Sequence, residues 1–301
     1  MLTQRSKSPL LPLETPCRWR GCLRCNTPMT QATTLPDWPY PRWIAHRGAG
    51  KLAPENTLSA AQLGAKYGYR MFECDVKLSS DGVPFLLHDS SLKRTTDAKT
   101  RLPAGSSPTA GDHPWAVLAL LDAGSWHSPA FTAEPLPTLD AIAAFCLGNS
   151  VLVNLEIKPT PGTERHTGEV VAHNVQRLWQ DSAIKPLLTS FDVEALEGTQ
   201  AAEPGLPRGL LLDAMRADWL DVAGKLGCRA VVCNYRLWNA RTVAQAKAAG
   251  LRTLSYTVND EDVATRLINW GLDGIITDRV DYLPQRPELA WAAALSSNMA
   301  A

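Results

Sequence analysis

From Trp43 onward the chain alternates short apolar runs, rich in Val, Ile and Leu, with alanine-rich stretches of helical periodicity. Parallel strands need long crossover connections, which are usually helices, so this alternation indicates a parallel sheet with helical crossovers. Eight strands of this kind fit a closed barrel. The runs predicted to be strands cover residues 43–47, 71–78, 151–158, 187–191, 209–213, 230–235, 253–259 and 274–278.

One connection is longer than this pattern requires. Residues 83–137 contain the apolar run VPFLLHD, followed by a stretch rich in Pro, Thr and Gly. We therefore predict a TIM (β/α)8 barrel with a small insertion after the second strand, at about residues 90–137, in a single domain of residues 39–301. Pro54 and Asn56 are expected to start and cap the helix that follows the first strand.

The N-terminal segment differs in composition from the rest. Residues 1–38 are rich in Pro, Thr, Ser and Arg and show neither helical nor strand periodicity, so we expect a poorly ordered extension. Met29 is a candidate for an alternative start. The cysteines of this segment, Cys17, Cys22 and Cys25, have no fourth ligand at a spacing that suits a zinc site.

Charge and hydropathy argue against several classes of function. The 301 residues include 30 basic and 30 acidic side chains, so there is no general attraction to nucleic acid or to an anionic membrane. No run approaches the ~20 consecutive apolar residues that span a bilayer, and the apolar core of a signal peptide is missing. We therefore expect a cytoplasmic protein without stable membrane insertion, and no pattern in the sequence defines its oligomeric state.

Charged side chains collect at the ends of the predicted strands, where a barrel of this kind builds its active site. Residues two apart on a strand share a face, so Glu73 and Asp75 point the same way, as do Glu156 and Lys158. Buried carboxylates are costly unless they are compensated or hold an ion, and oxygen ligands suit Mg²⁺ or Ca²⁺. The alternative is a set of ion pairs inside the barrel, Glu156 with Lys158 and Glu73 with Arg47.

Two histidines follow apolar runs. His46 ends the first predicted strand beside Arg47, and His88 ends the run VPFLLHD beside Asp89. An imidazole can exchange protons near neutral pH, so the two histidines are candidates for acid–base chemistry.

The Gly-Ala-Gly-Lys run at residues 48–51 suggests a nucleotide-binding loop at first sight. It lacks the Gly-x-x-x-x-Gly-Lys-[Ser/Thr] spacing, and no Gly-x-Gly-x-x-Gly follows a strand. A nucleotide-binding protein is therefore disfavoured. We expect Gly48 and Gly50 instead to let the backbone turn and come close to neighbouring groups.

Several longer motifs occur in a fixed order over residues 43–280. They are HRGAGKLAPENT, FECDVKLSSDGVPFLLHD, GSWHSP with LPTLDA, NLEIKP, YTVND and DGIITD. Together they resemble the glycerophosphodiester phosphodiesterases, most closely the cytoplasmic bacterial type associated with glycerol-phosphate uptake. The resemblance covers all of the chain except the N-terminal extension.

The resemblance implies a TIM-barrel hydrolase of glycerol and lipid metabolism that converts a small glycerophosphodiester to sn-glycerol 3-phosphate and an alcohol. It implies a divalent cation, Mg²⁺ or Ca²⁺, and attack by the substrate's own 2-hydroxyl through a cyclic phosphate. Each implied role falls on residues already singled out: Glu73, Asp75 and Glu156 for the metal, His46 and His88 for acid–base catalysis, Arg47 and Lys158 for the phosphate.

Two positions depart from the family pattern. The family often has Trp at Tyr256 and Phe at His127, and we take Tyr256 and Trp126 as candidates for the substrate pocket. Two other functions stay open. A phosphodiesterase of the lysophospholipase D kind would need an apolar groove or a membrane anchor, and a catalytically silent barrel acting as a binding protein would usually have lost a metal ligand or a histidine.

Overall fold

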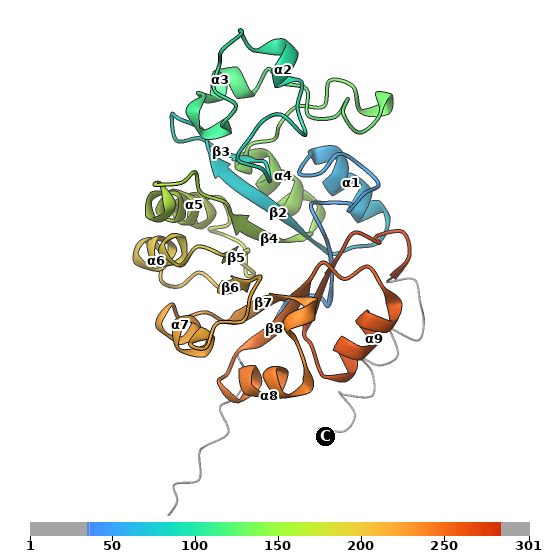
Figure 1. Ribbon diagram of the computed structural model, residues 1–301, viewed down its shortest axis with the longest axis vertical. Helices are drawn as coiled ribbons and strands as arrows, with labels where there is room; N and C mark the ends of the chain where they lie inside the picture. The colour runs from blue at the N-terminus through green and yellow to red at the C-terminus, as the bar shows by residue number, and fades with distance from the viewer. Residues whose placement is uncertain (1–34, 36, 284–301) are drawn as a thin grey trace, which may run out of the picture. The chain divides into compact units, whose positions relative to one another are not determined.

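A ring of parallel strands forms the centre of the computed structural model, which describes residue 35 and residues 37–283 (Figure 1). The strands pair in the order β1-β9-β8-β7-β6-β5-β4-β2, and Ala45 of β1 pairs with Phe72 of β2 to close the ring. This confirms the predicted barrel. Its strands are β1 (Trp43–Ala45), β2 (Met71–Leu78), β4 (Leu152–Ile157), β5 (Leu187–Ser190), β6 (Arg208–Leu212), β7 (Ala230–Asn234), β8 (Arg252–Tyr256) and β9 (Gly274–Thr277).

Helices surround the ring on its outer side (Figure 1). They are α1 (Leu58–Lys66), α4 (Leu139–Asn149), α5 (Glu164–Leu178), α6 (Val193–Ala202), α7 (Trp219–Lys225), α8 (Ala240–Ala248) and α9 (Glu261–Asn269), with a 3-10 turn, η3 (Tyr235–Leu237), after β7. None of the helices in the described part of the chain combines the length and the apolar character needed to cross a bilayer. The extension predicted at residues 1–38 lies almost wholly outside the described residues.

The start of α1 differs from the prediction. Thr57, and not Asn56, caps this helix: its side-chain oxygen accepts a hydrogen bond from the backbone N of Ala60 at 3.1 Å. Asn56 is buried and has a left-handed backbone conformation, with φ of 59°. The prediction is wrong because the Asn56 amide is engaged by a buried carboxylate of β2, described below.

The insertion after β2 begins with β3 (Pro84–Leu86), which pairs antiparallel to β2. The segment from residue 87 to residue 137 then carries η1 (Ala110–Asp112), η2 (Pro129–Phe131) and the short helices α2 (Ala98–Arg101) and α3 (Trp115–Leu118), drawn at the top of Figure 1. It has an apolar cluster of its own, which includes Leu92 and Leu118. It is also fastened to α1, because Glu134 accepts hydrogen bonds from the backbone N and the hydroxyl of Ser59.

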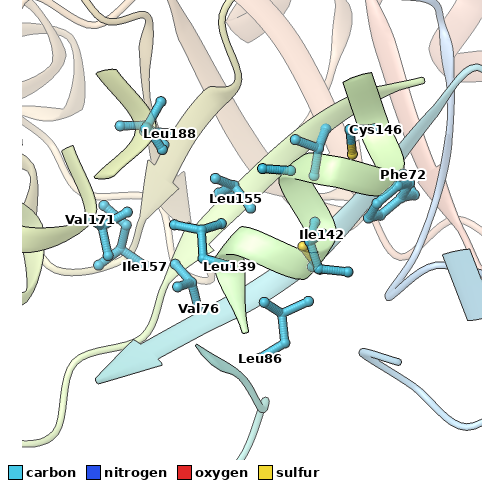
Figure 2. Packing of buried hydrophobic residues seen from close by; sticks show 14 of the residues in the cluster. Phe72, Val76, Leu86, Leu139, Ile142, Cys146, Leu155, Ile157, Val171 and Leu188 are labelled. Atoms are coloured by element: carbon cyan, nitrogen blue, oxygen red, sulfur yellow. The ribbon is translucent and has the colours of Figure 1, made fainter. Parts of the chain in front are cut away.

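Side-chain alternation along β2 separates the core from the site. Phe72 and Val76 belong to the apolar cluster between the sheet and helices α4 and α5, shown in Figure 2. Met71 points the other way, into an apolar layer inside the barrel. Glu73 and Asp75 share the inward face with Met71 but lie nearer the carboxyl end of the strand. One end of the barrel interior is therefore apolar and the other is charged.

Candidate active site

Three carboxylates meet at the carboxyl ends of two neighbouring strands. Glu73 and Asp75 lie on β2 and Glu156 lies on β4, where Asp75 and Glu156 are paired in register. One oxygen from each carboxylate lies within 4.8 Å of the others. Their side chains are only 3%, 1% and 12% exposed. The structure thus brings together the three carboxylates that were predicted to meet at the strand ends.

The electrostatics of this cluster favour a bound cation. Burial, together with the charges of Asp75 and Glu156, holds the pKa of Glu73 well above its usual range. Burial and the charge of Asp75 raise the pKa of Glu156 to about 7. Oε1 of Glu73 and Oδ1 of Asp75 are buried without a hydrogen-bond partner. A hard divalent cation would satisfy these oxygens and remove the repulsion, so the donor set fits such an ion.

The pKa of Asp75 is lowered, unlike the pKa values of its two neighbours Glu73 and Glu156. Burial alone would raise its pKa, but the charges of Arg47, His88 and Lys158 and a hydrogen bond from Asn56 hold the pKa below its usual range. The Asn56 side-chain amide donates to Asp75 Oδ2 at 2.8 Å, and the backbone N of Asp75 donates to Asn56 Oδ1 at 3.0 Å. Asn56 therefore orients a predicted metal ligand.

His46 is held by a carboxylate from the last strand of the barrel. Its Nδ1 lies 2.6 Å from Oδ1 of Asp278, the residue that follows β9. Asn259 fixes Asp278 by donating to Oδ2 at 2.9 Å and accepting from the backbone N at 2.8 Å. The other ring nitrogen of His46, Nε2, lies 3.9 Å from Oε2 of Glu73. With Nδ1 bonded to Asp278, Nε2 is the nitrogen available for proton exchange beside the cluster.

His88 has a similar arrangement on the other side of the cluster. Its Nδ1 lies 2.7 Å from Oδ1 of Asp89, and Arg94 donates to both oxygens of Asp89 at 2.7 and 2.9 Å. Burial lowers the pKa of His88, and the charges of Arg47 and Lys158 lower it further, against the opposing effect of carboxylates. Both histidines thus present Nε2 with Nδ1 fixed by a carboxylate.

The two cations predicted to bind phosphate flank the carboxylates. The backbone N of Arg47 donates to Glu73 Oε2 at 3.0 Å, while its guanidinium donates to Glu55 at 2.7 Å. Lys158 Nζ forms an ion pair with Oε1 of Glu156 at 2.7 Å, although the angles of this contact do not meet those of a hydrogen bond. The ion pair between Glu156 and Lys158 is therefore present, whereas Glu73 is held by the backbone of Arg47 and not by its side chain.

A cavity of about 330 Å³ opens beside this cluster. Its lining includes Lys77, His88, Glu156, Lys158 and Phe191. Lys77 continues the inward face of β2, donates from Nζ to the carbonyl oxygen of Lys158 at 3.1 Å, and has a pKa lowered to about 8 by burial. A second hollow, of about 460 Å³, lies at the opposite ends of the strands beside Leu152 and Trp179 and contains none of these groups.

The two candidates for the substrate pocket belong to different parts of the fold. Tyr256 ends β8, donates from its hydroxyl to the carbonyl oxygen of Leu212 at 2.9 Å, and packs against the cavity-lining Phe191 with ring centroids 5.8 Å apart. Trp126 lies in the insertion, 40% exposed, with its indole N bonded to the carbonyl oxygen of Ala123. Tyr256 therefore contacts a residue of the cavity wall, Phe191, but neither Tyr256 nor Trp126 is itself among the residues that line this cavity.

Sequence reasoning missed several groups that support the site: Glu55, Lys77, Arg94, Asn259 and Asp278. Asn259 and Asp278 lie in the motifs YTVND and DGIITD, which had been recognised without a role for these side chains. Lys77 follows Asp75 by two residues, so strand alternation could have found it. Nothing in the sequence signals the contact of Glu55 with Arg94, because 39 residues separate them.

The barrel, the carboxylate cluster and the two fixed histidines together suit an enzyme of the phosphoric diester hydrolase class. Comparison with known families agrees, since residues 46–282 match the glycerophosphoryl diester phosphodiesterase family. The chain belongs to this family, whose members are divalent-metal-dependent phosphodiesterases.

Individual relatives support the same assignment. The glycerophosphodiester phosphodiesterase of Bacillus subtilis (strain 168) is 30% identical over 256 residues, which cover 79% of this chain and 83% of the relative. A phosphodiesterase from Oleispira antarctica, solved with the product sn-glycerol-3-phosphate, is 31% identical with a TM-score of 0.73, over 85% of this chain and 97% of that chain. The glycerophosphodiester phosphodiesterase of Agrobacterium tumefaciens str. C58 is 28% identical with a TM-score of 0.67, over 80% of this chain and 97% of that chain.

Proposed function

We propose that this protein hydrolyses glycerophosphodiesters to sn-glycerol 3-phosphate and an alcohol, with His46 and His88 as the acid–base pair. The observation that carries this proposal is the placement of two histidines around one buried carboxylate cluster. Each histidine has its Nδ1 fixed by an aspartate, Asp278 or Asp89, so each has Nε2 free for a substrate proton.

Glu73, Asp75 and Glu156 would hold the divalent cation in this proposal. Mg²⁺ and Ca²⁺ both prefer carboxylate oxygens, and the family's dependence on a divalent metal supports this assignment. When bound, the cation supplies charge neutralisation at phosphate oxygens. Arg47 and Lys158 add two positive side chains beside the cluster and bind the non-bridging oxygens of the phosphodiester.

The first proposed step is attack by the 2-hydroxyl of the substrate's glycerol on phosphorus. One histidine takes the hydroxyl proton at Nε2, and the other gives a proton to the departing alcohol oxygen as its bond to phosphorus breaks. The product of this step is a cyclic phosphate. Intramolecular attack benefits from proximity, and it accounts for a requirement for glycerol without a strict demand on the alcohol.

In the second proposed step, water opens the cyclic phosphate. The histidines exchange roles: the one that gained a proton returns it to the 2-oxygen as that P–O bond breaks, and the other takes a proton from water. The net reaction consumes one water and leaves both histidines in their starting states. sn-Glycerol 3-phosphate, the compound bound in the Oleispira antarctica structure, is the expected product here.

The test is an assay of the purified protein on a panel of glycerophosphodiesters, before and after EDTA, with Mg²⁺ or Ca²⁺ added back. We expect metal-dependent release of sn-glycerol 3-phosphate. His46→Ala and His88→Ala should each lower kcat about 10²- to 10⁴-fold. His173→Ala is the matched control, because His173 also lies beside a carboxylate but is 61% exposed on α5.

Two outcomes would contradict the proposal. If no diester yields sn-glycerol 3-phosphate under any metal condition, the activity is wrong. If either His→Ala variant keeps activity within about tenfold of wild type, the acid–base assignment is wrong. The cyclic route has its own test: a substrate analogue without the 2-hydroxyl should not turn over, and turnover at the normal rate would discard this route.

A further inference from the structure

A line of alternating charges joins Arg47 to His88 across the mouth of the barrel. Arg47 donates to Glu55, Glu55 accepts from Arg94, Arg94 donates to Asp89, and Asp89 contacts His88. Each of these contacts is 2.7 Å long. The line therefore connects a group proposed to bind phosphate with a group proposed to move a proton.

Arg94 lies at the centre of this line and binds both carboxylates in the bidentate manner. Nη1 and Nη2 donate to the two oxygens of Glu55 at 2.7 Å each, while Nε and Nη2 donate to the two oxygens of Asp89 at 2.7 and 2.9 Å. The planar guanidinium suits such forked contacts, which fix direction as well as distance. The same Glu55 oxygen, Oε1, accepts from both Arg94 and Arg47.

One oxygen of Asp89 is likewise shared between Arg94 and a proposed functional side chain. Its Oδ1 accepts from Nη2 of Arg94 and also contacts Nδ1 of His88. Moving Arg94 would thus move both oxygens that orient the two functional side chains. Arg94 belongs to the insertion and Glu55 to the loop after β1, so the contact also fixes the distance between these two segments.

The contacts of Arg94 serve the site as well as the fold. Arg94 is 43% exposed, where a single ion pair contributes little to folding; its two bidentate contacts contribute more, and both lie next to predicted site residues. Another arginine of the insertion, Arg101 of α2, forms an ion pair with Asp97, the residue before this helix, at 3.3 Å. Asp97 contacts none of the predicted site residues, whereas Glu55 contacts Arg47 and Asp89 contacts His88.

We propose that Arg94 is a positioning residue: it fixes the orientation of Arg47 through Glu55 and the orientation of His88 through Asp89. This inference rests on the roles proposed above for Arg47 and His88. Arg94 has a second effect because it neutralises Asp89. Among the described residues, Asp75, Arg47 and Lys158 also act on the pKa of His88, and Lys77 and Glu156 line the same cavity. Without Arg94, Asp89 would stabilise the imidazolium form of His88 more strongly, so the ionisation of His88 would move to higher pH.

The test compares wild type, Arg94→Ala, Arg94→Lys, His88→Ala and the control Arg101→Gln in one assay. We expect Arg94→Ala to lower kcat/KM about 10²-fold, the size expected for misplaced catalytic groups. Millimolar guanidinium chloride should restore part of this activity, because the site of Arg94 is open to solvent. Arg94→Lys should recover little, since an ammonium cannot form two forked contacts. The limb of the pH profile that His88 controls should move to higher pH in Arg94→Ala.

Circular dichroism and thermal unfolding accompany each variant. Arg94→Ala should keep its fold, and Arg101→Gln should keep its activity. If Arg94→Ala stays within about threefold of wild type while His88→Ala is inactive, this inference is overturned and the proposed function stands. If activity is lost together with folding and guanidinium restores none of it, Arg94 is structural and the inference is again overturned. Full activity of His88→Ala would overturn the proposed acid–base pair and this inference with it.

Discussion

Replacement of Asp278 by asparagine tests how much of the chemistry depends on the orientation of His46. The carboxylate accepts from the imidazole with one oxygen and from Asn259 with the other, at 2.6 and 2.9 Å. The amide introduced by Asp278→Asn has nearly the same shape as the carboxylate but only one acceptor. If its oxygen faces His46, its NH2 group faces the NH2 group of Asn259, and two donors oppose each other.

Asn259 cannot relieve this conflict by rotating its amide. Its Oδ1 already accepts from the backbone N of Asp278 at 2.8 Å and from the hydroxyl of Thr277 at 3.2 Å. If the new amide turns its NH2 group to His46 instead, Nδ1 must become an acceptor, and the proton moves to Nε2. Either orientation removes the negative charge that stabilises the imidazolium.

The magnitude follows from the lost contact. A hydrogen bond to a charged group contributes about 1.5–3 kcal/mol. With about 1.4 kcal/mol for each factor of ten, we expect Asp278→Asn to lower kcat/KM by about 10- to 150-fold. The assay is release of sn-glycerol 3-phosphate from glycerophosphocholine at saturating metal, across a range of pH.

The control for this variant is Asp273→Asn. Asp273 is also nearly buried and also accepts from a backbone N, but it binds Arg252 and Thr253 at the other end of the barrel strands. The Asp273→Asn substitution should lower the thermal stability of the protein but leave kcat/KM of the folded enzyme unchanged. If Asp278→Asn folds normally and stays within about threefold of wild type, the proposed role of Asp278 is refuted.

Three further predictions follow from the site. In the metal-free protein, the pKa of Glu156 is raised to about 7, above its value in the unfolded chain. The melting temperature should therefore fall as pH rises from about 4.5 to 7, and added Mg²⁺ or Ca²⁺ should reverse the fall. A melting temperature that does not change over this pH range would contradict the prediction. Asn56→Ala removes two buried hydrogen bonds to Asp75 and should cost about 2–5 kcal/mol in urea unfolding, with about 10- to 100-fold weaker metal binding by calorimetry. Gly50→Ala should destabilise by more than about 1 kcal/mol, since φ is 59° and a Cβ would collide with the backbone of Asp278, whereas Gly105→Ala, also at positive φ but in open space, should lose less.

The fold could be predicted because its signals are local. Strand alternation placed Glu73 and Asp75 on one face, and crossover spacing indicated parallel strands, so the carboxylate cluster could be predicted from the sequence. Contacts between side chains of distant segments could not be predicted in this way. Asn56 illustrates the limit: beside a helix start an asparagine is expected to cap, yet its amide is used by Asp75, 19 residues away. Local propensity cannot reveal such a competition, because both uses satisfy the same hydrogen-bonding groups.

The contacts of the insertion with the loop after β1 and with the start of α1 have a consequence for how sequences of this kind can be recombined. Arg94 binds Glu55, Glu134 binds Ser59, and His127 Nε2 lies 3.1 Å from the carbonyl oxygen of Lys51. The two segments therefore form one exchangeable module. A chimera that takes the first loop from one relative and the insertion from another would separate these partners, whereas a crossover placed after residue 137 keeps them together. Fragment exchange among homologues should therefore succeed when the crossover follows residue 137, and fail when it separates the first loop from the insertion.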